Sequence, residues 1–327
     1  MKLVSYLKDG HDQVAAYIDG YLYDMENLHP DLPNNMSMFL NYWEESLSMA
    51  MGGEIMVKEG KISKNKGIAC DDVQLLAPVP FPASYRSAHA FRQPVTAIQK
   101  NQEENNTDAF DQYPVFNFGN HHSIQGPGEI RCMPDHLINL DFKPQVAVVI
   151  CKHGRNIRAE DAGEYIGGLM MLNGMKPGQL NNGGFNENHF SAAIGPWLVT
   201  IDELETYKVP AKANHIGSNW NLSMQGLVNG QQVSDGNAAS MNWSFAEIIE
   251  SASYGVDLVP GDVIASGAVG HGCFLSSNEQ GKLNDPAYTE QWLLEGDTVE
   301  MEIEGLGKLT NQIVREEDDF SILAKRK

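Results

Sequence analysis

Alternating apolar and polar positions predict strands along much of the chain. Between residues 298 and 304, Val299, Met301 and Ile303 alternate with glutamates, which is the period-two pattern of a strand with one solvated face. The run at 146–151 is instead continuously apolar and rich in β-branched residues, which is typical of a strand buried on both faces. The pattern Leu-Val-Pro-Gly-Asp-Val-Ile at 258–264 predicts a turn followed by a strand.

The first eighty residues predict a small β-meander followed by a helix. Apolar stretches at 3–7, 14–18 and 21–23 are separated by Asp-Gly pairs at 9–10 and 19–20, the turn residues of tight hairpins. Residues 36–51 carry large apolar side chains at helical spacing. A proline-punctuated run at 77–82 then ends regular structure. We therefore predict a small β-rich N-terminal domain with one helix at 1–80 and a larger domain at 81–327.

Two more helices are predicted in the larger domain. Ser244 and Glu247 have the spacing of a capping box ahead of an apolar pair, so a helix should begin there. We also expect a helix over 159–171. Because strands still predominate, the predicted fold class is α+β, mostly β.

Composition limits the possible partners. The chain has 327 residues, with 23 Lys and Arg against 43 Asp and Glu, and a formal charge of -20. A surface with this much negative charge repels phosphate backbones and anionic lipids. We therefore expect a small-molecule substrate, and we expect neither nucleic acid nor membrane partners. The polar N-terminus has no signal-peptide pattern, and the four scattered cysteines fit reduced thiols. We therefore expect a cytoplasmic location.

General catalytic motifs are missing from the sequence. It contains no Gly-x-Ser-x-Gly elbow, no His-Glu-x-x-His and no P-loop. His121 and His122 are adjacent, and on a strand they would point to opposite faces, so we expect one to be packed and the other solvated.

Six short stretches, in order along almost the whole chain, resemble the fumarylacetoacetate hydrolase (FAH) family. They are Gln-Gly-Pro-Gly-Glu at 125–129, the Leu-Asp-Phe strand at 140–150, Ile-Gly-Pro-Trp at 194–197, Leu-Val-Asn-Gly at 227–230, Pro-Gly-Asp-Val-Ile at 260–264 and the alternating segment at 299–307. The resemblance implies an FAH-type mixed β-roll catalytic domain behind a small β-rich domain, usually as a homodimer. It also implies a Mg²⁺ or Ca²⁺ ion that protein carboxylates hold. This ion would bind a 1,3-dicarbonyl or 2-oxo acid substrate, and a histidine would activate water.

The positions that would hold this metal and this base are all replaced. Matched to the family motifs, the replacements are Ser87 and Gly174 for aspartates, Lys143, Gln145 and, at about its position, Ser276 for glutamates, and Pro94 for the histidine. Without these carboxylates nothing offsets the cost of desolvating a divalent cation, and the Lys143 ammonium repels it. We therefore expect no metal, no cofactor and no metal-dependent hydrolysis at this site.

The preferred explanation is a pocket rebuilt for other chemistry. Lys143 and Lys176 would hold a carboxylate, an enolate or a 1,3-dicarbonyl oxygen, and a lysine there can act as a base or form an imine. His89 and His271 could carry protons. The reaction would be isomerisation, dehydration, decarboxylation or cyclisation of a 2-oxo acid, 1,3-dicarbonyl or polyketide-like substrate. The residues expected to bind this substrate are Arg92, Gln93, His122, Gln145, Asn173 and Ser276.

Two alternatives stay open at this point. The scaffold could be a catalytically silent pseudoenzyme that serves as a ligand-binding protein or partner subunit, or it could hydrolyse C–C bonds with a relocated metal site. Segment 175–188 is poor in order-forming residues and is interpreted either as a lid over the pocket or as a solvated insertion.

Overall fold

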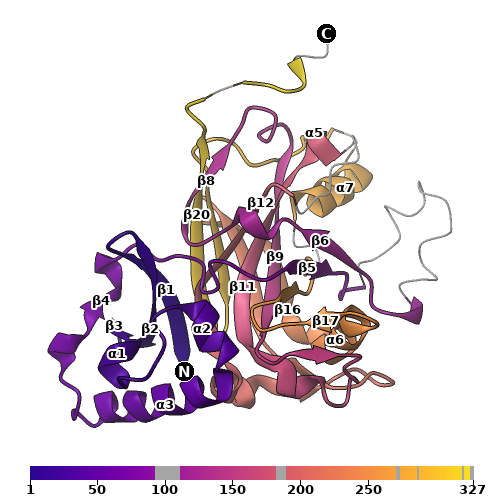
Figure 1. Cartoon of the computed structure of the whole chain (residues 1–327). Coiled ribbons are helices and arrows are strands. Elements are labelled where there is room, and N and C mark those ends of the chain that lie inside the picture. The colour runs from indigo at the N-terminus through magenta and orange to yellow at the C-terminus, as the bar shows by residue number, and fades with distance from the viewer. Residues whose placement is uncertain (93–110, 182–188, 270–272, 286, 319, 325–327) are drawn as a thin grey trace.

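A computed structural model describes residues 1–92, 111–181, 189–269, 273–285, 287–318 and 320–324. Its main feature is a large mixed sheet (Figure 1). The strands of this sheet are β1 Lys2–Lys8, β2 His11–Ile18, β3 Tyr21–Asp24, β4 Ile68–Ala69, β5 Tyr85–Ala88, β6 Phe116–Gly119, β7 Ile124–Gln125, β9 Leu140–Ile150, β11 Ile166–Pro177, β12 Ser191–Thr200 and β18 Val263–Ala265. Their spatial order is β4-β3-β2-β1-β12-β11-β9-β18-β5-β6, and β7 pairs with β12 beside this path.

A second sheet has the order β16-β15-β19-β20-β8, and two short ladders pair β10 with β17 and β13 with β14. The bounds of these strands are β8 Gly128–Cys132, β10 Gly154–Arg155, β13 Lys208–Pro210, β14 Ser218–Trp220, β15 Ser223–Val228, β16 Gln231–Asn237, β17 Asp257–Leu258, β19 Thr298–Ile303 and β20 Gly307–Arg315. The α-helices are α1 Met25–Leu28, α2 Met36–Asn41, α3 Trp43–Lys58, α5 Gly178–Asn181, α6 Phe245–Ser253 and α7 Phe274–Asn284. This arrangement confirms the predicted α+β, mostly β class.

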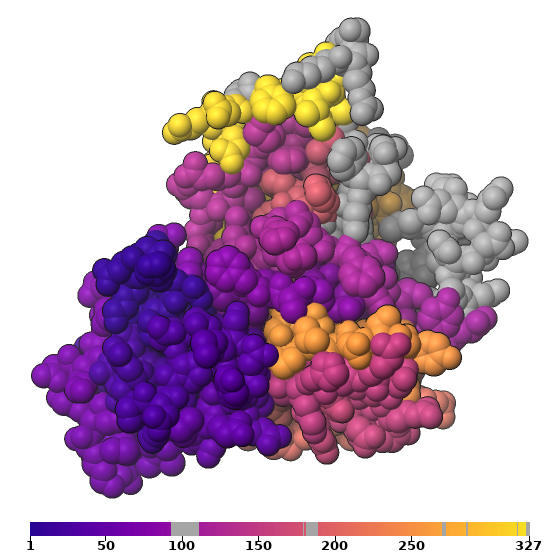
Figure 2. Space-filling model, viewed as in Figure 1, coloured from indigo at the N-terminus to yellow at the C-terminus, as the bar shows by residue number. Residues whose placement is uncertain are grey.

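The N-terminal strands continue the large sheet. β1 pairs antiparallel with β12, so the meander β1-β2-β3 extends the sheet of the larger domain. Figure 2 shows the N-terminal residues, in indigo and violet, packed against the pink and orange surface of the later segments. The domain boundary near residue 80 stays a prediction, as do the homodimer and the cytoplasmic location. Among the described residues, no helix is both long and apolar enough to span a membrane.

Local patterns account for several of these elements. The two Asp-Gly turns of the meander have positive φ at both residues, 49° and 80° at Asp9-Gly10 and 50° and 88° at Asp19-Gly20, as a type I′ hairpin turn requires. The capping box at Ser244 and Glu247 is present at the start of α6. β19 alternates half-buried and buried positions, as its sequence predicts.

Two predicted helices differ from the structure. The helix expected over 36–51 is split at Tyr42 into α2 and α3, and α3 continues to Lys58. The helix expected over 159–171 is wrong, because a 3₁₀ turn at Ala162–Tyr165 leads into β11. At Gly168 a Cβ would lie 2.3 Å from the Val199 carbonyl oxygen of β12, so close strand pairing explains the glycine. Since β11 is buried on both faces, its apolar residues show no strand periodicity.

Each face of the central strand β9 packs against a different layer. Phe142, Val146 and Val148 belong to a core that also contains residues of the second sheet, such as Met301 and Leu309. On the opposite face, Ala147 and Val149 belong to a core shared with the N-terminal helices. Towards the start of β9, this second face becomes polar, with Gln145, Lys143 and Asp141 in place of the apolar residues.

Neighbouring glycines in α3 test the packing of the N-terminal layer. A Cβ at Gly53 would lie 2.5 Å from the Cβ of Leu28, whereas a Cβ at Gly52 would meet nothing within 4 Å. Both alanine variants gain the same helix propensity, so the difference between them isolates the clash. We expect Gly53→Ala to be about 1–3 kcal/mol less stable than Gly52→Ala in chemical denaturation. Equal free energies of unfolding would contradict this packing of α3 on α1.

Candidate functional site

Four of the positions that the family resemblance predicts as replaced metal ligands come together on the polar face of β9. Lys143 of β9 is the register partner of Gly174 of β11, and paired residues of antiparallel strands share a face. Ser87 of β5 lies across β18 from this pair and donates a hydrogen bond from its Oγ to Gln145 Oε1 at 3.0 Å. Residues far apart in the sequence therefore form one cluster, which we call the Lys143 face: Ser87, Lys143, Gln145 and Gly174.

The side chain of Gln145 is the most deeply buried member of the Lys143 face. It is 0% exposed. Its Oε1 accepts hydrogen bonds from Ser87 Oγ and from the backbone N–H of Gly267, at 3.0 and 2.9 Å. Among the described residues, its Nε2 has no hydrogen-bond partner. A buried N–H donor without an acceptor costs about 1–3 kcal/mol, so an acceptor placed here is favoured.

The donors of the Lys143 face do not fit a divalent cation. A hard cation needs several oxygen ligands, mostly carboxylates, whereas this face presents an ammonium, an amide, a hydroxyl and a glycine. The only oxygen of the Gln145 side chain already accepts two hydrogen bonds. A side chain at Gly174 would also meet Gln145, because a Cβ there would lie 3.0 Å from Nε2.

Asp141 connects the Lys143 face to helix α7. Its carboxylate is 1% exposed. It accepts hydrogen bonds from the backbone N–H groups of Phe274 and Leu275 at the start of α7, at 2.8 and 2.9 Å, and from that of Phe142 at 2.9 Å. Burial raises the pKa of Asp141, opposed by these backbone donors and by Lys176. Asp141 thus fixes the start of α7 beside β9.

The N-cap of α7 adds polar groups close to Lys143. Cys273 Sγ lies 3.4 Å from Ser276 Oγ, which donates to the Cys273 carbonyl oxygen at 2.9 Å. Burial raises the pKa of the Cys273 thiol and Asp141 raises it further, while the Lys143 ammonium opposes both. Ser276 therefore lies at the start of α7, which Asp141 holds beside β9, the strand of Lys143. Burial raises the pKa of Glu279, and the charge of Lys176 opposes this rise.

The remaining predicted residues lie in different places. His89 is exposed and its Nε2 lies 3.2 Å from Asn117 Nδ2 of the neighbouring strand β6. Arg92 is exposed and forms an ion pair with Asp111. Asn173 is buried, and by strand alternation it faces away from Gly174 towards the second sheet. Gln93, Pro94 and His271 lie outside the described residues. Of the segment 175–188, residues 182–188 also lie outside them, and the rest forms the end of β11 and α5, so the choice between a lid and a solvated insertion stays a prediction.

His122 lies in a conformation that its sequence did not predict. His121 and His122 belong to a 3₁₀ turn, His121–Ser123, and their ring centroids are 4.2 Å apart. The expectation of opposite faces is therefore wrong, because it assumed a strand.

Within the part of the chain that the structure describes, no three His, Cys, Asp or Glu side chains form a group that could hold a metal.

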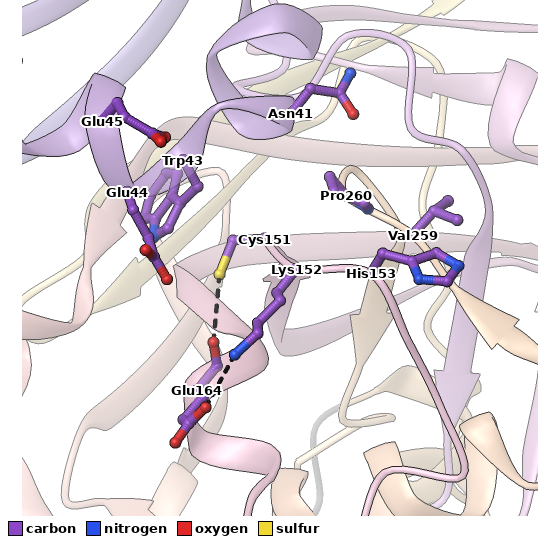
Figure 3. Close-up of a pocket in the computed structure, with 10 residues that line it drawn as sticks. All are labelled: Asn41, Trp43, Glu44, Glu45, Cys151, Lys152, His153, Glu164, Val259 and Pro260. Carbon is purple, nitrogen blue, oxygen red and sulfur yellow. Dashed lines mark hydrogen bonds and ion pairs between the residues drawn. The ribbon is translucent and has the colours of Figure 1, made fainter.

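A cavity of about 460 Å³ lies at the other end of β9. Figure 3 shows its wall, with Trp43, Glu44 and Glu45 from the start of α3 opposite His153 and Pro260. Its Lys152 Nζ is paired with Glu164 at 3.0 Å. None of its described lining residues contributes a buried polar atom that lacks a partner. Gln145 Nε2 has no partner in the ranges that the structure describes, so the Lys143 face is the better candidate site.

Sequence reasoning missed the parts of this site that depend on the backbone. The Gly267 N–H that orients Gln145 and the helix start capped by Asp141 have no local signal, because their partners lie 122 and 133 residues away. The Leu-Asp-Phe motif did mark Asp141 as part of the strand, but not as the cap of α7.

Comparisons with known proteins give a consistent result. The family model "Fumarylacetoacetate (FAA) hydrolase C-terminal" matches residues 84–314. A rat protein, "Oxaloacetate tautomerase Fahd2a, mitochondrial", is 27% identical over 326 residues, covering 96% of this chain and 92% of that protein. "Oxaloacetate tautomerase YisK" of Bacillus subtilis is 28% identical over 246 residues, covering 74% of this chain and 73% of its own.

Solved structures share the fold at low sequence identity. A fumarylacetoacetate hydrolase from Exiguobacterium antarcticum superposes with a TM-score of 0.67 at 22% identity, covering 97% of this chain and 100% of its own. Maleylpyruvate hydrolase from Sphingobium sp. SYK-6, in complex with manganese(II) ion and pyruvate, superposes with a TM-score of 0.68 at 18% identity, with the same coverage. At these identities the likeness concerns the fold, which matches the predicted FAH type.

Proposed function

The chain belongs to the fumarylacetoacetate hydrolase family, as its motifs predict, and from this premise we propose that it is a metal-independent isomerase of a small 2-oxo acid. The reaction is keto–enol tautomerisation, which needs neither water nor a redox partner. Curated relatives named oxaloacetate tautomerases support this type of reaction. The observation that carries the proposal is the cluster of Lys143 with the Gln145 Nε2 donor, which has no partner within the described part of the chain. The family resemblance assigns these positions to its metal ligands.

In this mechanism Lys143 moves one proton between carbon and oxygen. Its amine removes a proton from the carbon next to the keto group, and the C–H electron pair forms the C=C bond of the enol. The carbonyl electron pair moves onto the oxygen, which receives the proton back from the Lys143 ammonium. Atoms and charge balance without a co-reactant. The same ammonium stabilises the charge that develops on oxygen in the transition state.

The other residues of the site support this step. Asp141 holds the start of α7 beside Lys143. Lys176 stands on the same face as Lys143, diagonal to it, because it pairs in register with Asp141. Its positive charge favours an anionic substrate over a neutral one. His89 is less suited to proton transfer, because it lies beside Asn117 at the exposed edge strand.

Deuterium exchange tests the proposal directly. In D₂O, enolisation replaces the hydrogens on the carbon next to the keto group, and proton NMR measures their loss. With oxaloacetate or an acylpyruvate and a metal chelator, we expect exchange to be faster with the protein than in buffer alone, and no C–C cleavage products. Exchange no faster than in buffer across such a panel would favour the silent ligand-binding alternative, and cleavage that requires metal would favour the hydrolase alternative.

A further inference from the structure

We infer that Gln145 Nε2 and the Lys143 ammonium form a two-point oxygen site beside Gly174, which holds the two oxygens of a 2-oxo acid enolate in one plane once the Lys143 amine has taken up the proton. The inference rests on the proposed function and makes it more specific, because it names the chemical group that is recognised. In this site a neutral N–H donor and a lysine ammonium take the place of a metal ion that would coordinate two substrate oxygens.

The hydrogen bonds of Gln145 fix the orientation of its amide. The Gly267 N–H can only donate, so the side-chain atom 2.9 Å from it must be the oxygen. Ser87 Oγ donates to the same oxygen. Turning the amide over would place two N–H donors against each other and leave the oxygen without this partner. Nε2 is therefore held as a donor that points away from Ser87 and Gly267.

Because residue 174 is a glycine, no side chain of its own stands against this donor. A Cβ at Gly174 would lie 3.0 Å from Gln145 Nε2, which is about a hydrogen-bond distance, and 3.8 Å from the Cβ of Lys143. The position is thus adjacent to both side chains. A ligand oxygen at this position would accept a hydrogen bond from Gln145 Nε2. A second oxygen of the same planar ligand would then lie on the side of Lys143.

The pair of donors selects a particular ligand. The buried N–H of Gln145 and the lysine ammonium are both hydrogen-bond donors. Together they favour a planar ligand with two oxygens along the same edge, at least one of them charged. A 2-oxo carboxylate offers this arrangement in its planar form, and its enolate offers it with more charge on oxygen. A simple carboxylate presents both oxygens on one carbon, and it lacks the keto oxygen.

Calorimetry with oxalate, in the presence of a chelator, tests the inference. Oxalate is a planar dianion with the paired oxygens of a 2-oxo acid enolate, and acetate serves as the single-carboxylate comparison. We expect oxalate to bind more tightly than acetate. Gly174→Ala should weaken oxalate binding about 10- to 100-fold, the usual value of one hydrogen bond to a charged group, because its methyl group takes the place of the ligand oxygen.

Two further variants make the result decisive. A Cβ at Gly174 would lie 3.0 Å from Gln145 Nε2, so Gly174→Ala must shift this amide by a few tenths of an ångström. Thermal unfolding is measured for each variant, and oxalate affinity is compared only between folded proteins. Gln145→Glu keeps an oxygen for Ser87 and Gly267 but replaces the donor by a carboxylate that repels a dianion, so it should lose oxalate at least as strongly as Gly174→Ala does. Gly163→Ala, where a Cβ would meet nothing within 4 Å, is the matched control and should bind normally.

The outcomes separate this inference from the proposed function. Wild-type oxalate affinity in folded Gly174→Ala, or no oxalate binding by the wild type, would overturn the oxygen site even if deuterium exchange is catalysed. Oxalate binding by the wild type that is lost in Gly174→Ala and Gln145→Glu supports the oxygen site. This conclusion holds even if the protein catalyses no deuterium exchange, in which case only the proposed function has failed.

Discussion

Replacing Lys143 by alanine should lower the protein-catalysed exchange of a 2-oxo acid by about 10²- to 10⁴-fold, the usual contribution of a positioned acid or base. Lys143 is half-buried on the polar face of β9, and its charge reaches Cys273 at the start of α7. The variant loses both the proton carrier and the positive charge. The initial rate of deuterium exchange in chelated buffer measures the effect.

An arginine at the same position separates the two roles of the lysine. Lys143→Arg keeps the positive charge but stays protonated at any ordinary pH, so it cannot carry the proton. We expect it to retain much of the oxalate affinity and little of the exchange rate. Exchange at the wild-type rate in Lys143→Ala would exclude Lys143 as the catalytic group. Full activity in Lys143→Arg would leave it only an electrostatic role.

Replacing Asp141 by alanine should lower the free energy of unfolding by about 3–5 kcal/mol. The buried carboxylate accepts three backbone hydrogen bonds, two of them from the first turn of α7. Without it these N–H groups are left unpaired, at about 1–3 kcal/mol for each buried donor. The charge of the carboxylate also favours the positive end of the helix. Chemical denaturation at neutral pH measures the loss.

Asparagine at position 141 is the control for the carboxylate. Asp141→Asn keeps one acceptor oxygen of the same shape, so it should lose less stability than Asp141→Ala. If the two variants are equally stable and both resemble the wild type, the contact between β9 and α7 does not hold this region together. Because Asp141 lies next to the Lys143 face, Asp141→Ala should also reduce the exchange rate.

The fold was predictable where a single strand or turn carries its own signal. The Asp-Gly turns, the capping box of α6 and the alternation in β19 each depend on residues within a few positions of one another. The failure at 159–171 has a different origin. β11 is covered on both faces and lies close to β12 at Gly168, so its apolar residues reflect tertiary packing that no local pattern records.

The candidate site was predictable only through the family motifs. They predict Ser87, Lys143, Gln145 and Gly174 as replacements of metal ligands, and the structure brings these four residues together. The motifs did not predict that Gln145 would turn its oxygen towards Ser87 and Gly267 and leave Nε2 as a donor. They also placed Asn173 in the pocket, whereas strand alternation turns it to the opposite face. Such orientations depend on hydrogen bonds between distant segments.

Metal dependence of the wild-type exchange reaction tests the central claim most directly. The protein is treated with chelator, and the deuterium exchange rate of oxaloacetate is measured before and after the addition of Mg²⁺, Mn²⁺ or Ca²⁺, with a protein-free control for each metal. A site built from Lys143 and the Gln145 amide predicts exchange in chelator that the metals leave unchanged once the control is subtracted. Exchange that disappears on chelation and returns with stoichiometric metal would contradict the account.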